Sequence, residues 1–155
     1  MKIIYDITRL LNRIDNYTPT GIDRVDVNYL YHLLKSKKYD LNGVYQNNGL
    51  LIYLDKEETK EIAELAFSYW CLGSKFCPIL SKEIKRRTLG SNVTFKRKNS
   101  FHTKVSLIDP RIVDDLQKYP KTIYINNSHH GLLSNDIFIA LKFNYGCKLV
   151  YFIHD

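Results

Sequence analysis

Stretches typical of β-strands alternate with stretches typical of amphipathic helices along most of this chain, and that alternation restricts the possible folds more than any other feature. Short runs are rich in β-branched and aromatic residues, whereas the segments between them repeat apolar residues at every third or fourth position. This order predicts an α/β fold, a Rossmann-like, doubly wound and mostly parallel sheet. The expected strands are 2–8, 41–46, 50–54, 122–126 and 147–153, and the expected helices are 22–37, 57–70, 78–88, 110–119 and 134–145.

Local signals refine this outline. Thr20 is followed three residues later by Asp23, which resembles the capping box of a helix N-terminus. The sequence Asn47-Asn48-Gly49 predicts a tight hairpin turn between the second and third strands. Residues 9–16 are polar with a few leucines, and we expect a loop or short turn there, whereas 91–103 predicts a mobile loop or hairpin. The apolar segment 147–153 predicts a buried strand.

The length suits one domain, and we expect residues 1–155 to form a single unit. No apolar run approaches the roughly 18 residues of a membrane span. The N-terminus lacks a signal peptide, so we expect a cytoplasmic protein. The three cysteines fit no metal-binding spacing, and we expect no metal. Because the chain stops directly after an expected strand, at His154 and Asp155, we expect it to be the first half of something larger.

The net charge of +7 is concentrated in one window. Residues 82–104 contain eight lysines and arginines and one acid, Glu83. The net charge of this window therefore equals that of the whole chain. Such a patch favours an anionic partner, namely nucleic acid, a phospholipid surface or an anionic substrate, although it can also be a solvated loop. Segment 76–87 could form the basic amphipathic helix that a membrane surface requires. No nucleic-acid-binding signature is present, and we expect no nucleic acid. The candidate contacts are Lys85, Arg86, Arg87, Lys96, Arg97 and Lys98.

Three loops follow expected strands and should meet at one edge of the sheet, because ligands of such sheets bind beyond the carboxyl ends of parallel strands. In the first, Gly21 lets a ligand approach the backbone, the helix start favours an anion, and Arg24 could add charge. The alternative is that Gly21 only makes a tight turn while Arg24 pairs with Asp23 or Asp26.

The other two loops carry histidines. His129 and His130 are adjacent and therefore point in different directions, which makes them a poor metal pair. Either one is structural and the other exposed, or one contacts a substrate. His154 can hydrogen-bond a substrate hydroxyl or titrate near neutrality, or it can simply belong to a frayed end.

Four blocks in order along the chain together resemble bacterial glycosyltransferases of family 4, which are GT-B enzymes of surface-polysaccharide synthesis. The blocks are 4–10 (IYDITRL), 19–25 (PTGIDRV), 124–132 (YINNSHHGL) and 149–155 (LVYFIHD). The resemblance implies the N-terminal, acceptor-side Rossmann-like half of a two-domain, retaining enzyme that uses a nucleotide-sugar donor and no metal. It implies that such an enzyme often acts at the inner face of the membrane on a lipid-linked saccharide.

The resemblance also implies roles for individual residues. Gly21 and Arg24 would face the donor diphosphate, His154 would lie beside the transferred sugar, and His129 and His130 would lie on the acceptor side. The family continues into a second domain that holds most of the donor, so this chain alone should be inactive without that domain or a partner chain that supplies it. Two other functions stay open: a non-catalytic module that docks to a protein or an anionic membrane through 82–104, and a flavodoxin-like nucleic-acid binder.

Overall fold

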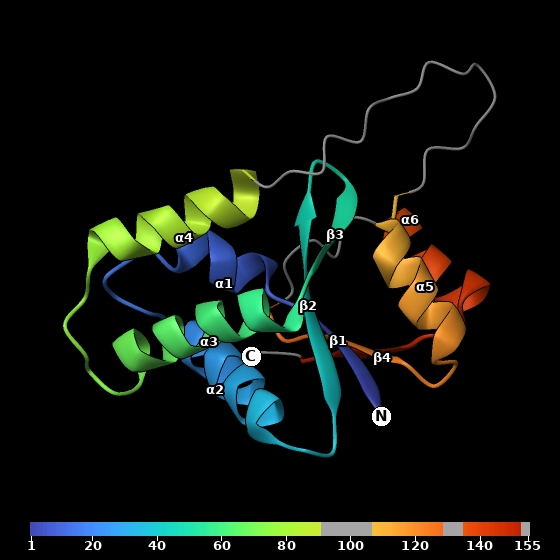
Figure 1. Ribbon diagram of the computed structural model, residues 1–155, viewed down its shortest axis with the longest axis horizontal. Coiled ribbons are helices and arrows are strands. Elements are labelled where there is room, and N and C mark those ends of the chain that lie inside the picture. Colours follow the sequence, from blue (N-terminus) through green and yellow to red (C-terminus); the bar gives the residue numbers. More distant parts are fainter. Residues whose placement is uncertain (91–106, 129–134, 153–155) are drawn as a thin grey trace.

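A computed structural model of the protein describes residues 1–90, 107–128 and 135–152 (Figure 1). Its elements follow the expected alternation of strands and helices. In chain order they are β1 (Lys2–Asp6), α1 (Thr8–Arg13), α2 (Gly21–Lys35), β2 (Asp40–Asn47), β3 (Leu50–Leu54), α3 (Lys56–Trp70), α4 (Pro78–Gly90), α5 (Pro110–Lys118), β4 (Ile123–Asn126), α6 (Asn135–Ile139), the π-helical turn η1 (Ala140–Asn144) and β5 (Lys148–Tyr151). The expected loop or hairpin over 91–103 lies outside the described residues.

The five strands form one sheet in the order β3-β2-β1-β4-β5. β1 pairs in parallel with β2 and β4, and β4 pairs in parallel with β5. The β2–β3 hairpin is antiparallel, and its turn places Asn48 and Gly49 at positive φ of 49° and 75°, as the Asn-Asn-Gly sequence predicts. The predicted Rossmann-like, mostly parallel sheet is therefore confirmed.

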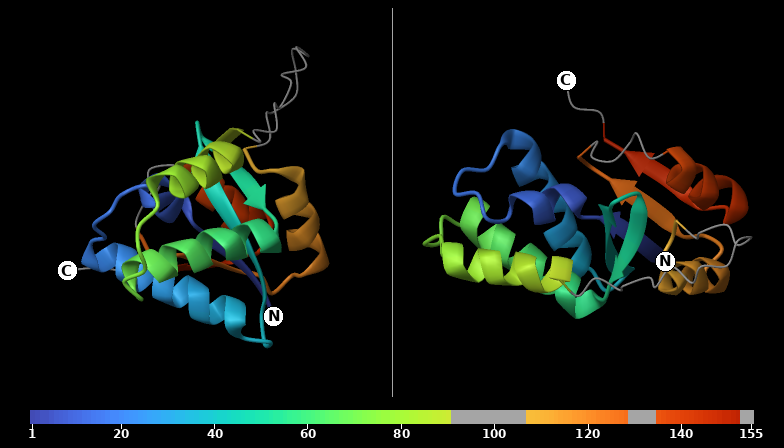
Figure 2. Two further views of the ribbon diagram at one scale, coloured as in Figure 1. Left: turned by 60° about the vertical axis from the view of Figure 1, so that its left-hand side comes forward. Right: turned by 90° about the horizontal axis from the view of Figure 1, so that it is seen from above.

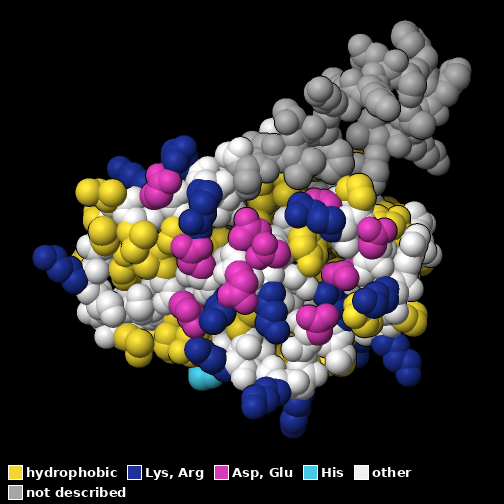
Figure 3. Space-filling view, in the orientation of Figure 1, with side chains coloured by type: hydrophobic (Ala, Val, Ile, Leu, Met, Phe, Trp, Pro, Cys, Tyr) yellow, Lys and Arg dark blue, Asp and Glu magenta, His cyan; other side chains and the backbone are white. Residues whose placement is uncertain are grey.

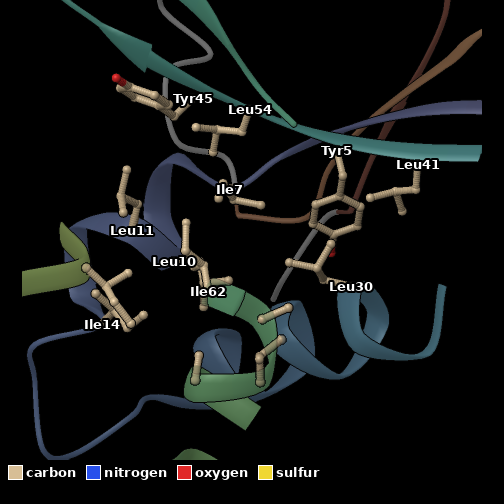
Figure 4. Close-up of a cluster of buried hydrophobic side chains, with 14 of the residues drawn as sticks. Tyr5, Ile7, Leu10, Leu11, Ile14, Leu30, Leu41, Tyr45, Leu54 and Ile62 are labelled. Carbon is tan, nitrogen blue, oxygen red and sulfur yellow. The ribbon is translucent and has the colours of Figure 1, made fainter. Parts of the chain in front are cut away.

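Helices cover both faces of the sheet (Figure 2). Helices α1, α2, α3 and α4 lie on one face, and α5 and α6 lie on the other. Successive residues of β1 alternate between the two cores: Ile3 and Tyr5 belong to the first and Ile4 to the second. Figure 4 shows the first core, where side chains of the sheet meet those of α1, α2 and α3. The fold is thus doubly wound, with its two layers of helices on a shared sheet.

Helix α1 corrects the expectation of a loop over 9–16. Leu10, Leu11 and Ile14 are fully buried in the first core together with Ile7. These four apolar residues follow the helical spacing of three and four, while the polar residues between them occupy the other side of the turn. Packing of one apolar stripe was enough to form a helix of six residues without a side-chain N-cap.

Strand β5 corrects the expectation that segment 147–153 is a buried strand. Lys148 is exposed, and Leu149, Val150 and Tyr151 are only half-buried. The reason is its place in the sheet, because β5 is the edge strand beyond β4. An apolar run without alternation predicts a buried strand, whereas here both faces are only partly covered and one edge has no described neighbour.

The start of α2 is fixed as its sequence predicts. The side chain of Thr20 accepts a hydrogen bond from the Asp23 backbone N–H, and the Asp23 carboxylate accepts one from the Thr20 backbone N–H. This capping box ends the preceding loop and places Gly21 as the first helical residue. Because β1 runs toward this end of the molecule, the start of α2 lies near the carboxyl edge of the sheet.

Candidate binding site at the carboxyl ends of the strands

The carboxylate of Asp6 is the centre of a buried hydrogen-bond network at the end of β1. It accepts hydrogen bonds from the backbone N–H of Thr8 (2.9 Å), from Gln46 Nε2 (3.0 Å) and from Asn126 Nδ2 (3.3 Å). The hydroxyls of Thr8 and Tyr124 also donate to it. Burial and the nearby Asp6 carboxylate raise the pKa of Tyr124 well above its ordinary value, so this phenol stays protonated. The network ties β1, β2 and β4 together at the edge where ligands of such sheets bind.

A second buried acid, Asp26 of α2, lies close to this network. The hydroxyl of Tyr5 donates to Asp26 Oδ1 at 2.8 Å and itself accepts from Asn127 Nδ2 at 2.6 Å. Asp26 Oδ2 is buried and has no hydrogen-bond partner among the residues that the structure describes. Burial raises the pKa of Asp26 to about 7; the hydrogen bond from Tyr5 and the charge of Arg9 oppose that rise, and the carboxylates of Asp6 and Asp23 add to it. This carboxyl group can therefore exchange a proton near neutral pH.

Two arginines of α1 hold the carboxylate of Asp23. Arg9 Nε donates to Oδ1 at 2.8 Å and Arg13 Nε donates to Oδ2 at 2.7 Å, while Arg9 Nη2 also reaches Thr20 Oγ1 at 3.3 Å. Burial acts to raise the pKa of Asp23, but the hydrogen bonds from Thr20 and from the two arginines outweigh it, and the pKa is lowered. Asp23 is thus an ionised carboxylate in the first turn of α2, and the two guanidinium groups that hold it carry one more charge than it does.

Gly21 and Arg24 both face solvent at this loop. Gly21 is exposed, and a Cβ built on it would meet nothing within 4 Å. Arg24 is exposed as well and makes no ion pair with a described residue. The alternative of an ion pair from Arg24 to Asp23 or Asp26 does not occur, since Asp23 is held by Arg9 and Arg13 and Asp26 by Tyr5. Arg9 and Arg13 of α1 and Arg24 in the first turn of α2 therefore bring three guanidinium groups to this region. Two of them pair with Asp23, and the charge of Arg9 also acts on the buried carboxyl group of Asp26.

A surface hollow of about 440 Å³ lies beside Gly21, and we call it the aromatic hollow. One wall is the loop before α2, and the other is the end of α3 with the loop that follows. Trp70 Nε1 donates to the Asn16 carbonyl at 3.3 Å, and Asn28 Nδ2 donates to Cys71 Sγ at 3.2 Å, which fixes the two walls against each other. The lining consists of residues 17–19, 24, 69–71, 73, 74 and 76.

Three of the four described cations of the basic segment are engaged in ion pairs. Lys85 Nζ pairs with Asp15 at 2.9 Å, Arg86 pairs with Glu83 on its own helix at 2.8 Å, and Arg87 pairs with Glu61 of α3. Asp15 and Glu61 lie on other elements of the fold, so the net positive charge at the surface of α4 is smaller than the sequence of 82–104 suggests. Lys96, Arg97 and Lys98 lie outside the described residues.

The three histidines singled out from the sequence, His129, His130 and His154, also lie outside the described residues. Ser128 is buried, and its backbone N–H donates to Asn126 Oδ1 at 3.0 Å, so the end of β4 points into the network around Asp6. The ring of Phe152 packs against that of Tyr29 on α2 at 4.8 Å. Ser128 and Phe152, the last described residues before the histidines, therefore lie at the carboxyl edge of the sheet.

Sequence reasoning missed Asp6, Asp26 and the arginines of α1. Asp6 was visible as an acid inside an apolar strand, and such a residue needs buried partners. Arg9 and Arg13 are four residues apart, which places them on one face only if the segment is helical. An expected loop over 9–16 does not predict that the two arginines share a partner.

Neither a metal cluster nor a membrane span is found in the described residues. No group of three or more His, Cys, Asp or Glu side chains in ranges 1–90, 107–128 and 135–152 could hold a metal ion. None of the helices in this part of the chain combines the length and the apolar character that crossing a bilayer requires.

Comparison of the chain with protein-family models, with curated proteins and with solved structures found no match. The resemblance to family 4 glycosyltransferases therefore depends on the four sequence blocks alone. The geometry of the site has to carry the functional argument.

Proposed function

We propose that this chain is the acceptor-side half of a glycosyltransferase that moves a sugar from a nucleotide-sugar donor to a saccharide hydroxyl. A second domain or a partner chain would supply most of the donor site. The observation that carries the proposal is the open backbone at Gly21 at the carboxyl edge of a parallel sheet, with Arg9 and Arg13 held on Asp23 and the exposed Arg24 in the same turn of α2. Fixed positive charge at such a place stabilises the diphosphate that leaves a nucleotide sugar.

The arginines near Gly21 would have different roles. Asp23 orients Arg9, whose side chain is 22% exposed and also contacts Thr20, so its charge stays beside the turn. Together, Arg9 and the open backbone at Gly21 would face the diphosphate. Arg24 lines the aromatic hollow next to them. His154 would position the donor sugar, and His129 and His130 would lie toward the acceptor, as the resemblance implies.

Two substitutions at Gly21 distinguish the effect of an added negative charge from that of an added side chain. Gly21→Glu should fold normally, because no atom lies within 4 Å of the added Cβ and acidic residues suit the first turn of a helix. Its charge would repel the diphosphate, and we expect transfer to fall by about tenfold or more. Gly21→Ala fills the same space without charge and is the matched control, with activity near wild type.

The assay should use the form of the protein that occurs in its native cells, captured with an antibody against this domain and supplied with labelled nucleotide sugars. The mass of the captured form shows whether a second domain is present. His154→Ala should lower kcat by about a hundredfold if it positions the donor sugar. No sugar transfer by the captured form, or equal transfer by Gly21→Glu and Gly21→Ala, would contradict the proposal.

One observation favours a second function, docking to an anionic membrane surface. The loop after α3 and the first turn of α4 expose Leu72 (68%), Ile79 (81%) and Leu80 (45%). Lys75 and Lys82 beside them are exposed and make no ion pair with a described residue. Figure 3 shows hydrophobic side chains gathered at the end of the molecule where α3 ends and α4 begins. Apolar side chains surrounded by lysines are typical of proteins that lie on a lipid surface.

This observation moves the expected contact from Lys85, Arg86 and Arg87 to the start of α4. Flotation with vesicles of phosphatidylglycerol should recover the protein, and vesicles of phosphatidylcholine should not. Ile79→Ser should abolish flotation, whereas Arg86→Gln should leave it unchanged, because Arg86 already pairs with Glu83. Recovery of Ile79→Ser at the wild-type level would exclude this function.

A further inference from the structure

The aromatic hollow has a lining in which Arg24 is the one ionised side chain among the described residues. Its other lining side chains are aromatic, hydroxyl, proline, glycine or thiol groups. Cys71 stays a neutral thiol, since burial raises its pKa, although Asn28 and the charge of Arg24 oppose the rise. A hollow with one cation and no anion selects a ligand that carries negative charge.

Three aromatic rings line the hollow in an arrangement that does not suit a flat base. The Tyr17 and Phe76 rings lie 5.7 Å apart at 74°, and the Tyr69 and Phe76 rings lie 5.1 Å apart at 70°. A nucleobase or another planar ring is held best between parallel faces, and these rings are nearly perpendicular to each other. The indole of Trp70 is 95% covered and offers no further face. A non-planar ring with C–H groups on its faces fits such a corner better.

The hollow also presents hydroxyl groups that the described residues leave without a hydrogen-bond partner. The side-chain hydroxyls of Tyr17, Tyr69 and Ser74 make no hydrogen bond with a described residue, and each can both donate and accept one. The volume of about 440 Å³ lies at the lower end of the usual range of ligand sites, about 300–1,000 Å³. Aromatic faces, free hydroxyls and one cation together match a sugar ring with an acidic substituent.

We propose that the aromatic hollow binds an acidic pyranose, a sugar ring that carries a carboxylate or a phosphate. Arg24 pairs with the acidic group, and Tyr17, Tyr69 and Phe76, which pack edge to face against one another, contact one side of the sugar ring. This assigns Arg24 to the acceptor and leaves Gly21 and Arg9 to the diphosphate. As an account of the acceptor it rests on the proposed function, but the binding itself requires no transfer reaction and is measured separately.

The test is a nuclear magnetic resonance titration of this chain with three methyl glycosides or sugars: methyl glucuronide, glucose 6-phosphate and methyl glucoside. The two acidic sugars should shift the Trp70 indole signal and the amide signals of residues 69–76. The neutral glucoside should bind with at least about tenfold lower affinity. The stronger of the two acids identifies whether carboxylate or phosphate is recognised. No binding of either acid, or equal binding of the neutral sugar, would overturn the proposal.

Three variants assign the contacts. Arg24→Gln should reduce the affinity for the acidic sugars to that of the neutral glucoside, because it removes the charge but keeps a polar side chain. Tyr17→Ala should weaken acidic and neutral sugars alike and leaves the Gly21 turn intact. Arg86→Gln removes an arginine of similar exposure outside the hollow and is the matched control. An equal loss from Arg24→Gln and Arg86→Gln would mean that only net charge is sensed, and the site would be wrong.

The titration and the transfer assay fail independently. If the acidic sugars bind as described but the captured native form transfers no sugar, the proposed function fails and the sugar site stands. If the native form transfers sugar while the acidic sugars do not bind here, the acceptor lies elsewhere and this site fails.

Discussion

Asp6 joins three strands through side-chain contacts, although it belongs to only one of them. Each of the groups around it is a donor: a backbone N–H, two hydroxyls and two side-chain amides. A carboxylate can accept all of these bonds, and no other side chain of the same size can. The acid in the first sequence block is therefore explained by the fold itself, whatever ligand binds nearby.

Asp6→Asn should lower the free energy of unfolding by about 2–4 kcal/mol, because the amide nitrogen would face donors inside a buried network. Urea unfolding followed by circular dichroism measures this loss. Tyr124→Phe removes one donor and is the comparison, with an expected loss of about 1.5–3 kcal/mol for a hydrogen bond to a charged group. A smaller effect of Asp6→Asn than of Tyr124→Phe would show that the network does not depend on the carboxylate.

Asp26 should make the stability of the protein depend on pH. Burial raises its pKa from 3.8 to about 7, so between these values the folded state holds a proton that the unfolded state has lost. This group therefore destabilises the fold progressively as pH rises from about 4 to about 7, by up to about 4 kcal/mol for a shift of three units.

Asp26→Asn removes this dependence while keeping an oxygen for the Tyr5 hydroxyl. We expect the variant to gain stability relative to wild type as the pH is raised from 4 to 8, measured by urea unfolding at each pH. The difference between the two proteins isolates Asp26 from Asp23 and Asp109, whose lowered pKa values act in the opposite direction. A constant difference across that range would mean that Asp26 is ionised in the folded protein.

The sequence reveals which residues are polar and apolar but not which charges meet. Asp23 was expected as part of a capping box, and it is, yet its two arginine partners come from a helix that the sequence did not predict. Arg87 and Glu61 are 26 residues apart and Lys85 and Asp15 are 70 apart. Such pairs depend on helix packing, so they could not be found from a local pattern.

At the scale of elements, the contact between β2 and α3 is close enough to exclude any side chain at Gly43. A Cβ there would lie 2.6 Å from Oγ1 of Thr59, a residue whose hydroxyl accepts from the Gly43 N–H and donates to the Asp55 carbonyl. The helix can approach the strand this closely because Gly43 has no side chain.

Gly43→Ala should therefore lower the free energy of unfolding by about 1–3 kcal/mol, since Thr59 is held by two hydrogen bonds and cannot move aside. The same substitution in a Thr59→Ala background should cost much less, because the two closest atoms are gone. A double-mutant cycle of urea unfolding measures the coupling. Equal costs in both backgrounds would mean that the strand shifts instead.

Most elements were predictable, and the errors have a common cause. Long amphipathic helices such as α2 and α3 and the hairpin turn carry their own signals of period and capping. Helix α1 and strand β5 are short, and their structure is decided by what packs on them. The apolar stripe of α1 forms a helix only because it packs on the core, and β5 is half-exposed because it lies at the edge of the sheet. Both depend on tertiary structure, so local propensity predicts a loop and a buried strand instead.

For the whole molecule, the sheet order predicts an uneven distribution of stability. The N–H of Ile7, which directly follows β1, donates to the Val44 carbonyl of β2 at 2.8 Å, whereas the N–H groups of Lys148 at the start of β5 and of Phe152 directly after it donate from the edge of the sheet. Native-state hydrogen exchange should show the Ile7 amide protected up to global unfolding and the amides of Lys148 and Phe152 exchanging at least about tenfold faster. Equal protection would indicate that β5 opens only with the entire sheet.

The location of the candidate site was predictable, but its contents were not. Parallel strands bring their carboxyl ends to one edge, and the loops after β1 and β4 do begin there. The direction of each side chain depends on packing, which placed Arg24 at a hollow formed with the end of α3. The sequence blocks point to the carboxyl edge of the sheet. That residues 69–76 also lie there is seen only in the structure.

The two edges of the sheet differ in a way that affects how the sheet can be extended. On the outer side of β3, Leu51 bridges to the chain at 107–109: its N–H donates to the Leu107 carbonyl, its carbonyl accepts from the Asp109 N–H, and the Asp109 carboxylate accepts from the Tyr53 N–H. On the outer side of β5, no described segment pairs. Within the described part of the chain, the outer edge of β3 is therefore paired, whereas that of β5 keeps unpaired backbone groups. A strand contributed by a fused segment or a designed peptide should add next to β5 rather than next to β3.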